Sequence, residues 1–137
     1  LEFSEADLRR RAAASVALAS LLLSTNDVKS ANQHIDAIDT RVVLAPEMEF
    51  ERYLIAARVA VANKSIDIAR THLGKCVEII EAIPAGAHLK NLAHRVAEVY
   101  EGIGDVDLAF AVMRSGQTRT PNFLGTSQPA TSKSTKN

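Results

Sequence analysis

The sequence predicts an all-α fold, an array of three antiparallel helical hairpins followed by a disordered C-terminal tail. The composition is 47% hydrophobic but only 4% aromatic, and much alanine with few aromatics suits closely packed helices better than a β-sandwich. No stretch keeps the period-two alternation of a strand, and only residues 41–44 are briefly ambiguous. Capping and helix-stopping residues divide the chain up to about residue 115 into six segments.

The first three helices are assigned from the residues that open them. Ser4 and Asp7 form a capping box, in which the serine side chain bonds to the backbone of the first turn. Asn26 and Asp27 cap the second helix, and Pro46 has a backbone angle that suits the first turn of the third. The expected ranges are about 4–23, 26–40 and 46–62.

The last three helices are assigned from residues that begin or end them. Ser65 caps the fourth helix, which ends before Pro84 because proline disfavours a helical residue in front of it. Gly102 and Gly104 stop the fifth helix, and Asp105 caps the sixth. The expected ranges are about 65–83, 85–102 and 105–116.

The breaks between paired helices repeat in phase along the chain. After each break stands an anchor alanine, and the anchors are spaced by 38 and 40 residues. The anchors are Ala31, Ala69 and Ala109, with Ala19, Ala57 and Ala97 twelve positions upstream and Ile35, Leu73 and Met113 four positions downstream. Small residues let two helices approach closely, and large apolar residues one turn away pack around the point where the helices cross. The pattern predicts hairpins at about 4–45, 46–84 and 85–115, within one domain of residues 1–115.

This pattern resembles the tetratricopeptide repeat (TPR) family. The best copy is LAHRVAEVYEGIGDVDLAFAVM, residues 92–113, which matches at Ala97, Tyr100, the Gly104-Asp105 bend and Ala109. The resemblance covers about residues 12–116, although the repeats run to 38 and 40 residues against about 34 in the family. Longer repeats of this kind are similar to the helical-hairpin arrays of some bacterial regulators. The resemblance implies a TPR-like α-solenoid.

The resemblance also implies a function. In the family, the first helix of each hairpin lines a concave surface that holds a segment of a partner, so we expect a non-enzymatic protein–protein interaction module, a scaffold. The expected partner-binding residues are Glu51, Leu54, Arg58, Asn91, His94, Glu98 and Glu101, with Val16, Ser20 and Leu23 on the first helix. This groove would run from apolar to acidic, which favours a basic or amphipathic peptide or helix.

The alternative function is self-association, or a sensor segment of a larger, bacterial-type regulator. No polar capping helix follows the last predicted helix, which leaves Phe110 and Met113 available to pair with another copy. The alternative therefore predicts a homodimer formed through these two side chains.

The remaining motifs do not indicate catalysis. Residues 102–107, GIGDVD, lack the third glycine and the preceding strand of a dinucleotide-binding fingerprint, and supply only the first two ligands of a calcium loop. His72 and Cys76 share a helix face, but two ligands do not make a zinc site, and we expect Cys76 in the core. We expect no enzyme activity, cofactor or metal; an enzyme that uses His72, Cys76 or His94 is the remaining alternative.

Charge and targeting patterns bear on partners and location. The 16 Lys and Arg balance the 16 Asp and Glu, so neither nucleic acid nor a membrane is expected as a partner. Arg9 to Arg11 and the apolar run 12–23 imitate a secretory signal, but the capping box before them argues against one. The single Cys76 favours a reducing compartment, so we expect a cytoplasmic location.

Residues 116–137 form the predicted tail. This segment is rich in Ser and Thr, contains two prolines and has too little apolar content to fold alone. We therefore expect a disordered end whose hydroxyls could accept phosphate.

Overall fold

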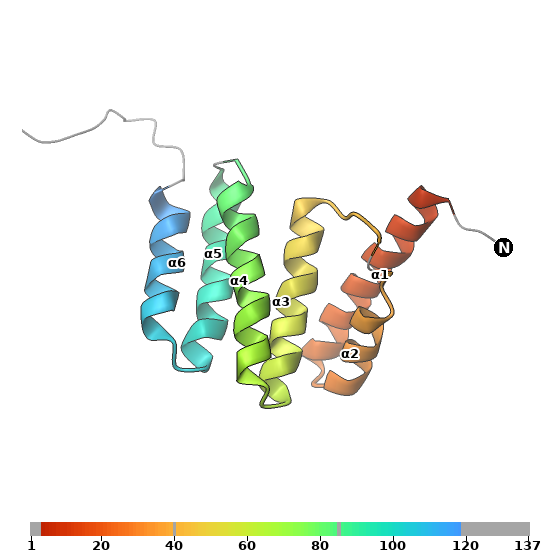
Figure 1. Ribbon diagram of the computed structural model, residues 1–137, viewed down its shortest axis with the longest axis horizontal. Coiled ribbons are helices and arrows are strands. Elements are labelled where there is room, and N and C mark those ends of the chain that lie inside the picture. Colours follow the sequence, from red (N-terminus) through yellow and green to blue (C-terminus); the bar gives the residue numbers. More distant parts are fainter. Residues whose placement is uncertain (1–3, 40, 85, 119–137) are drawn as a thin grey trace, which may run out of the picture.

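The computed structural model describes residues 4–39, 41–84 and 86–118, and within them the all-α prediction is confirmed by six helices and no strand (Figure 1). The helices are α1 (Glu5–Ser24), α2 (Val28–Asp36), α3 (Pro46–Ala62), α4 (Ile66–Ala82), α5 (Ala87–Gly102) and α6 (Val106–Thr118). Their order is the predicted one, and the differences lie at the helix ends. None of the described helices has the length and apolar content that a bilayer crossing requires.

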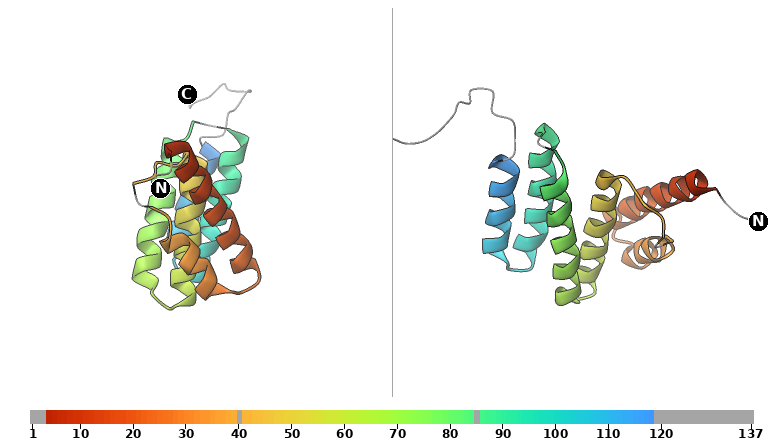
Figure 2. Two further views of the ribbon diagram at one scale, coloured as in Figure 1. Left: turned by 90° about the vertical axis from the view of Figure 1, so that its right-hand side faces the viewer. Right: turned by 45° about the horizontal axis from the view of Figure 1, so that its top comes forward.

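Consecutive helices pack in pairs, α1 with α2, α3 with α4 and α5 with α6. Helix α3 also contacts both helices of the first pair, and α5 contacts both helices of the second. Figure 1 shows the pairs following one another along the long axis, with α1 and α6 at opposite ends. Figure 2 shows the first pair tilted relative to α3–α6. Each pair therefore meets the next mainly through the first helix of the later pair.

The turns inside the three pairs have the same backbone geometry. Each holds one residue at positive φ, namely Asn26 (65°), Lys64 (63°) and Gly104 (90°). The N–H of the next residue donates to a carbonyl five positions earlier, at N···O distances of 2.8, 2.8 and 2.9 Å. This combination is a Schellman helix ending. The positive-φ residues are spaced by 38 and 40, like the anchor alanines, so the backbone repeats in the phase read from the sequence.

The predicted caps are only partly formed by side chains. Ser4 Oγ accepts from the Asp7 N–H at 3.1 Å, and Asp27 Oδ1 accepts from the Ser30 N–H at 3.2 Å. Ser65 stands at the N-cap of α4, but its hydroxyl makes no capping hydrogen bond. The carboxylate of Asp105, which stands before α6, instead receives two hydrogen bonds from Arg70 of α4, at 2.8 and 3.0 Å.

The interior consists of two apolar clusters that share α3. The first joins α1, α2 and the 38–44 segment to Ile55 and Val59 of α3. The second is formed by α3, α4, α5 and α6, with Phe50 and Leu73 near its centre. The anchor alanines and their upstream counterparts are buried, with exposures of 0% for Ala19, Ala31, Ala57 and Ala69 and 5% for Ala97 and Ala109. Close helix crossings at these alanines explain why small residues repeat there.

Two helix ends differ from the prediction for packing reasons. Helix α2 ends at Asp36 rather than near residue 40, because the following segment turns to bury Ile38 and Val42 in the first cluster. Helix α6 runs to Thr118, so residues 116–118 of the predicted tail are helical; Gly116 packs against α5 there. The rest of the predicted tail, residues 119–137, lies outside the described residues.

Candidate functional site

The predicted groove does not continue across all three pairs, and the prediction for Leu54 is wrong. Leu54 is only 2% exposed and packs in the second cluster with Leu89 of α5. Val16 and Leu23 are buried likewise in the first cluster, with Ile55 of α3. In the first two pairs, the next pair packs on the helix face that the prediction assigned to the groove. Only on α5 does this face stay open within the described chain.

The other predicted residues of α3, and Asn91, are not buried, and Glu51 is paired. Glu51 receives two hydrogen bonds from Arg95 of α5, at 2.6 and 2.7 Å, and both side chains are about one-third exposed. The guanidinium of Arg95 also lies 5.5 Å from the ring centroid of Phe50, and its bond to Glu51 raises the pKa of Arg95. Glu51 therefore already ties α3 to α5. Arg58 and Asn91 are exposed.

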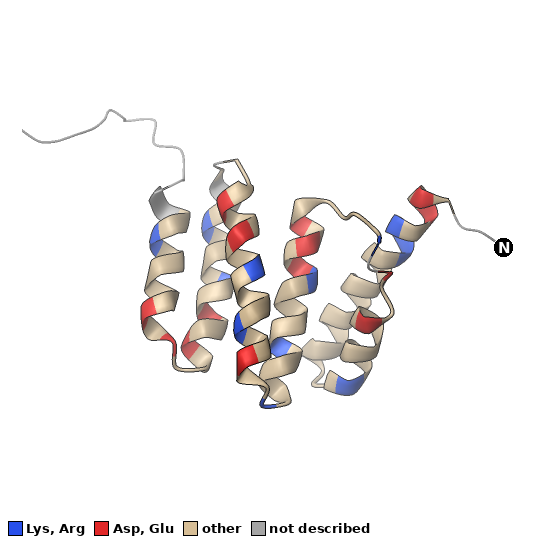
Figure 3. Cartoon of the chain, viewed as in Figure 1, with Lys and Arg blue, Asp and Glu red and all other residues tan. Residues whose placement is uncertain are grey.

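The structure brings three predicted residues together at the end of the molecule. His94, Glu98 and Glu101 of α5 line a cleft of about 140 Å³ with Phe110 and Met113 of α6, the two side chains predicted for self-association. His94 Nε2 lies 3.5 Å from Glu98 Oε2, and Phe110 is 62% exposed. Figure 3 shows acidic positions gathered around the α5–α6 turn, although charges of both signs are spread over the chain. We call the lining of this cleft the terminal face: His94, Ala97, Glu98, Glu101, Val106, Ala109, Phe110 and Met113.

The terminal face has counterparts inside the molecule. Residues 40 positions before Ala97, Ala109 and Met113 are Ala57, Ala69 and Leu73, which are fully buried. A further 38 positions back stand Ala19, Ala31 and Ile35, which belong to the first cluster. Helix α5 packs against α3 and α4, and α3 packs against α1 and α2. Three apolar positions of the terminal face thus repeat positions that lie in the interior of the first two pairs, whereas the counterpart of Phe110 in the second pair is the exposed Arg70.

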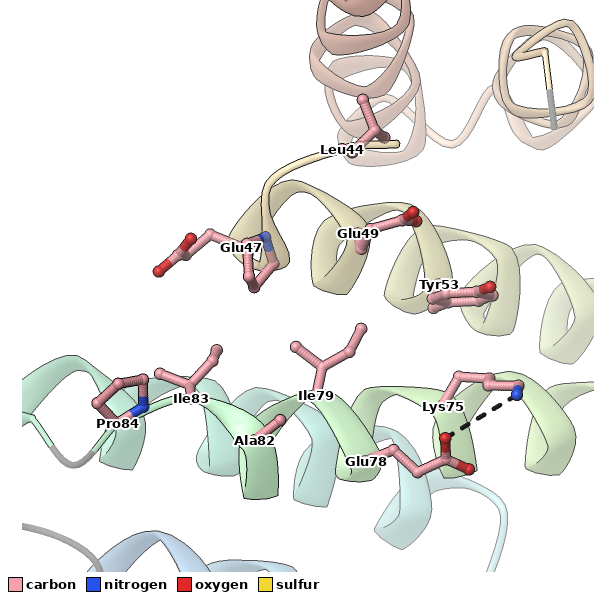
Figure 4. A pocket seen from close by; sticks show the side chains of 11 residues that line it. Leu44, Glu47, Glu49, Tyr53, Lys75, Glu78, Ile79, Ala82, Ile83 and Pro84 are labelled. Carbon is pink, nitrogen blue, oxygen red and sulfur yellow. Dashed lines mark ion pairs between the residues drawn. The ribbon is translucent and has the colours of Figure 1, made fainter. Parts of the chain in front are cut away.

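A larger cleft, which the sequence did not reveal, lies between α3 and α4 (Figure 4). We call it the α3–α4 cleft; it has a volume of about 450 Å³. Its lining comes from the first turns of α3, the last turns of α4 and the segments beside them: Leu44, Pro46, Glu47, Glu49, Tyr53, Lys75, Glu78, Ile79, Ala82, Ile83 and Pro84. The available signal was the extra length of the repeats before Pro46 and Pro84, which falls at this end of the pair.

Acidic side chains predominate among the charged groups of this cleft. It has three glutamates and one lysine, Lys75, whose Nζ lies 3.9 Å from Glu78 Oε1. Glu49 Oε1 lies 2.8 Å from Arg52 Nη2, an ion pair without hydrogen-bond geometry, and this buried oxygen accepts no hydrogen bond. Glu47 Oε2 lies 4.0 Å from His88 Nε2, and the Glu47 side chain is 60% exposed. The carboxylate of Glu47 is therefore the group of this cleft that an entering cation can reach most readily.

The thiol and imidazole considered as catalytic groups lie elsewhere. Cys76 is fully buried, and its thiol donates to the Phe50 carbonyl at 3.7 Å. Burial raises its pKa to about 12, so the thiolate needed for nucleophilic attack is scarce at neutral pH. Burial, with a smaller effect of Arg52, lowers the pKa of His72. Over residues 4–118, apart from the undescribed residues 40 and 85, no three His, Cys, Asp or Glu side chains gather as metal ligands would.

Comparison of the chain with family models, with curated proteins and with solved structures gave no match. The two clefts and the repeated turns are therefore the features from which a function can be argued.

Proposed function

We propose that this chain is a TPR-like scaffold, an array of three antiparallel hairpins that binds a partner polypeptide and performs no catalysis itself. Support comes from the three Schellman turns and the buried alanines, which share spacings of 38 and 40 residues. Helical repeats stack on their neighbours and bind partners on the surface that remains open. The observation that carries the proposal is the terminal face, an open cleft on the third pair, whereas each of the first two pairs has the next pair packed on it.

The partner segment in this proposal is an amphipathic helix with basic residues along one edge. Its apolar side would pack on Phe110 and Met113, which line the cleft. Its Lys or Arg residues would lie near Glu98 and Glu101. The counterparts of these glutamates 40 positions earlier are Arg58 and Val61, so the acidic rim is particular to the third hairpin.

Self-association is the second candidate, and a matching surface on α1 favours it. Leu18 and Leu21 are 41% and 62% exposed on α1. Leu21 stands 38 positions before Val59, one of the residues with which α3 packs on the first pair. The α1 helix of a second copy could therefore cover the terminal face in a head-to-tail contact.

A binding titration with two synthetic helices tests the proposal. One helix carries leucines on one face and lysines on the other, the second has glutamates in place of the lysines, and both have about 18 residues, or five turns. We expect the lysine helix to bind more tightly. Phe110→Ser should weaken it by about tenfold or more, because buried aromatic anchors dominate such contacts. Leu108→Ser is the matched control, since Leu108 is 47% exposed on the same helix but does not line the cleft.

Sedimentation equilibrium separates the two candidates. Concentration-dependent association that both Leu21→Ser and Phe110→Ser abolish would favour the head-to-tail contact. A monomer that binds the lysine helix supports partner binding. Equal effects of Phe110→Ser and Leu108→Ser on helix binding would refute the terminal face as the site.

A further inference from the structure

The α3–α4 cleft is elongated along the helix pair. Its lining on α3 runs from Pro46 to Tyr53, and on the α4 side from Lys75 to Ile83. At 1.5 Å per residue, seven to eight helical residues span roughly 10–12 Å. This length holds about three residues of extended chain at roughly 3.3 Å each.

The walls combine apolar side chains with acidic groups at the rim. Leu44 and Ile83 are 7% and 4% exposed, and Figure 4 shows Ile79 and Ile83 directed from α4 toward α3. The rim carries Glu47, whose side chain is 60% exposed, and Glu49, which pairs with Arg52. An occupant that fits both features has apolar side chains beside a cationic one.

The repeat itself does not require this cleft. The equivalent space in the first pair is smaller, about 260 Å³, and has Arg11 and Ser15 at the positions of Glu49 and Tyr53. In the third pair the equivalents of Tyr53 and Cys76 are Ala93 and Gly116, which lie so close that a Cβ on Gly116 would stand 2.6 Å from Ala93 Cβ. Helices therefore pack at this end with a smaller cleft whose charged lining residues are Arg11 and Asp39, or with a closed one. The large, acidic and apolar cleft is thus particular to the second pair.

We propose that the α3–α4 cleft is a second binding site, which takes a short extended peptide segment with apolar side chains flanking a lysine or arginine. The apolar side chains pack on Leu44, Ile79 and Ile83, and the cation lies beside Glu47 and Glu49. The excess of carboxylates over ammonium groups in the lining selects a basic over an acidic segment. The site is separate from the terminal face, so either can fail without the other.

Methyl NMR of the isoleucine-labelled full chain tests this site. The probes are acetyl-Leu-Lys-Leu-amide, the matched acetyl-Leu-Glu-Leu-amide, and hexylamine as a small apolar cation. We expect the lysine peptide to shift the methyl signals of Ile79 and Ile83 at millimolar concentration, and the glutamate peptide to bind at least about fivefold more weakly. Ala82→Trp, which fills the cleft from an exposed position, should abolish the shifts. Ala111→Trp, an exposed alanine of α6, should preserve them.

Three results would overturn the proposal. The first is equal binding of the two peptides, which would remove the charge selection. The second is hexylamine binding without peptide binding, which would make the cleft a small-molecule site. The third is retention of the Ile79 and Ile83 shifts in the Ala82→Trp protein, provided that its remaining methyl spectrum shows the wild-type fold.

Discussion

Replacing Gly116 by alanine tests the closest helix contact in the third pair. A Cβ at position 116 would lie 2.6 Å from Ala93 Cβ and 3.5 Å from the Leu89 carbonyl oxygen. Carbon atoms in favourable contact stand about 3.5–4.0 Å apart, so the added methyl overlaps by roughly 1 Å. Gly74 of α4 offers a matched control, because a Cβ there would meet nothing within 4 Å.

The two substitutions should change stability in opposite directions. Replacing glycine by alanine within a helix ordinarily raises the free energy of unfolding by up to about 1 kcal/mol. We expect Gly74→Ala to raise it by about 0.5–1 kcal/mol, which is the difference in helix propensity. At Gly116 the same gain is opposed by overpacking, which costs about 1–3 kcal/mol. We therefore expect Gly116→Ala to lower the free energy of unfolding by about 1 kcal/mol, so that the two variants differ in stability by roughly 2 kcal/mol.

Urea unfolding followed by far-ultraviolet circular dichroism measures this difference. Unchanged m-values would allow the midpoints to be compared directly. Ala93→Gly should rescue part of the Gly116→Ala loss, because it removes the methyl group on the other side of the contact. If Gly116→Ala is as stabilising as Gly74→Ala, the helices do not approach closely here, and our explanation of the closed third cleft fails.

Three further predictions concern the turns and the core. Lys64→Gly should stabilise the chain by about 0.5–1 kcal/mol in thermal unfolding, because Lys64 holds the positive φ that glycine adopts freely; an unchanged melting temperature would count against the turn geometry. Stability should fall as the pH rises from about 9 toward 12, because the Cys76 thiol loses its proton later in the folded state than in the unfolded one; Cys76→Ala should flatten this part of the profile. A double-mutant cycle on Glu51 and Arg95 should give a coupling of about 1 kcal/mol, measured by urea unfolding, and a zero coupling would mean that their bidentate contact is not kept in solution.

The helices could be predicted from the sequence because the residues that begin and end them act locally. Pro46 and Gly104 act on their own residues and immediate neighbours, and the predicted breaks at these positions are helix boundaries in the structure. The regular spacing of the anchor alanines also predicted which helices form a pair. The end of α2 was missed, because burial of Ile38 and Val42 in the first cluster overrides the local signal there.

The candidate sites were less predictable, because they depend on which helix faces are covered. Helix α3 has buried side chains on several sides, including Phe50, Leu54 and Ile55, so its periodicity does not single out one groove face. The prediction for Leu54 failed for this reason. His94 is exposed whereas its counterpart Leu54 is buried, because no described helix packs on this face of α5, which a pattern on α5 alone cannot reveal. The α3–α4 cleft depends on how far two helices diverge.

The division of the interior into two clusters that share α3 has a consequence for partial unfolding. Opening of α1 and α2 would expose Ile55 and Val59 but would leave the second cluster, α3 to α6, in place. Such subglobal openings give exchange protection that falls in steps along a chain. Amide hydrogens of the first pair should then exchange sooner than those of α3 and α4. The terminal face and nearly all of the α3–α4 cleft would survive this opening, so ligand binding at either should slow exchange in α3–α6 more than in α1 and α2.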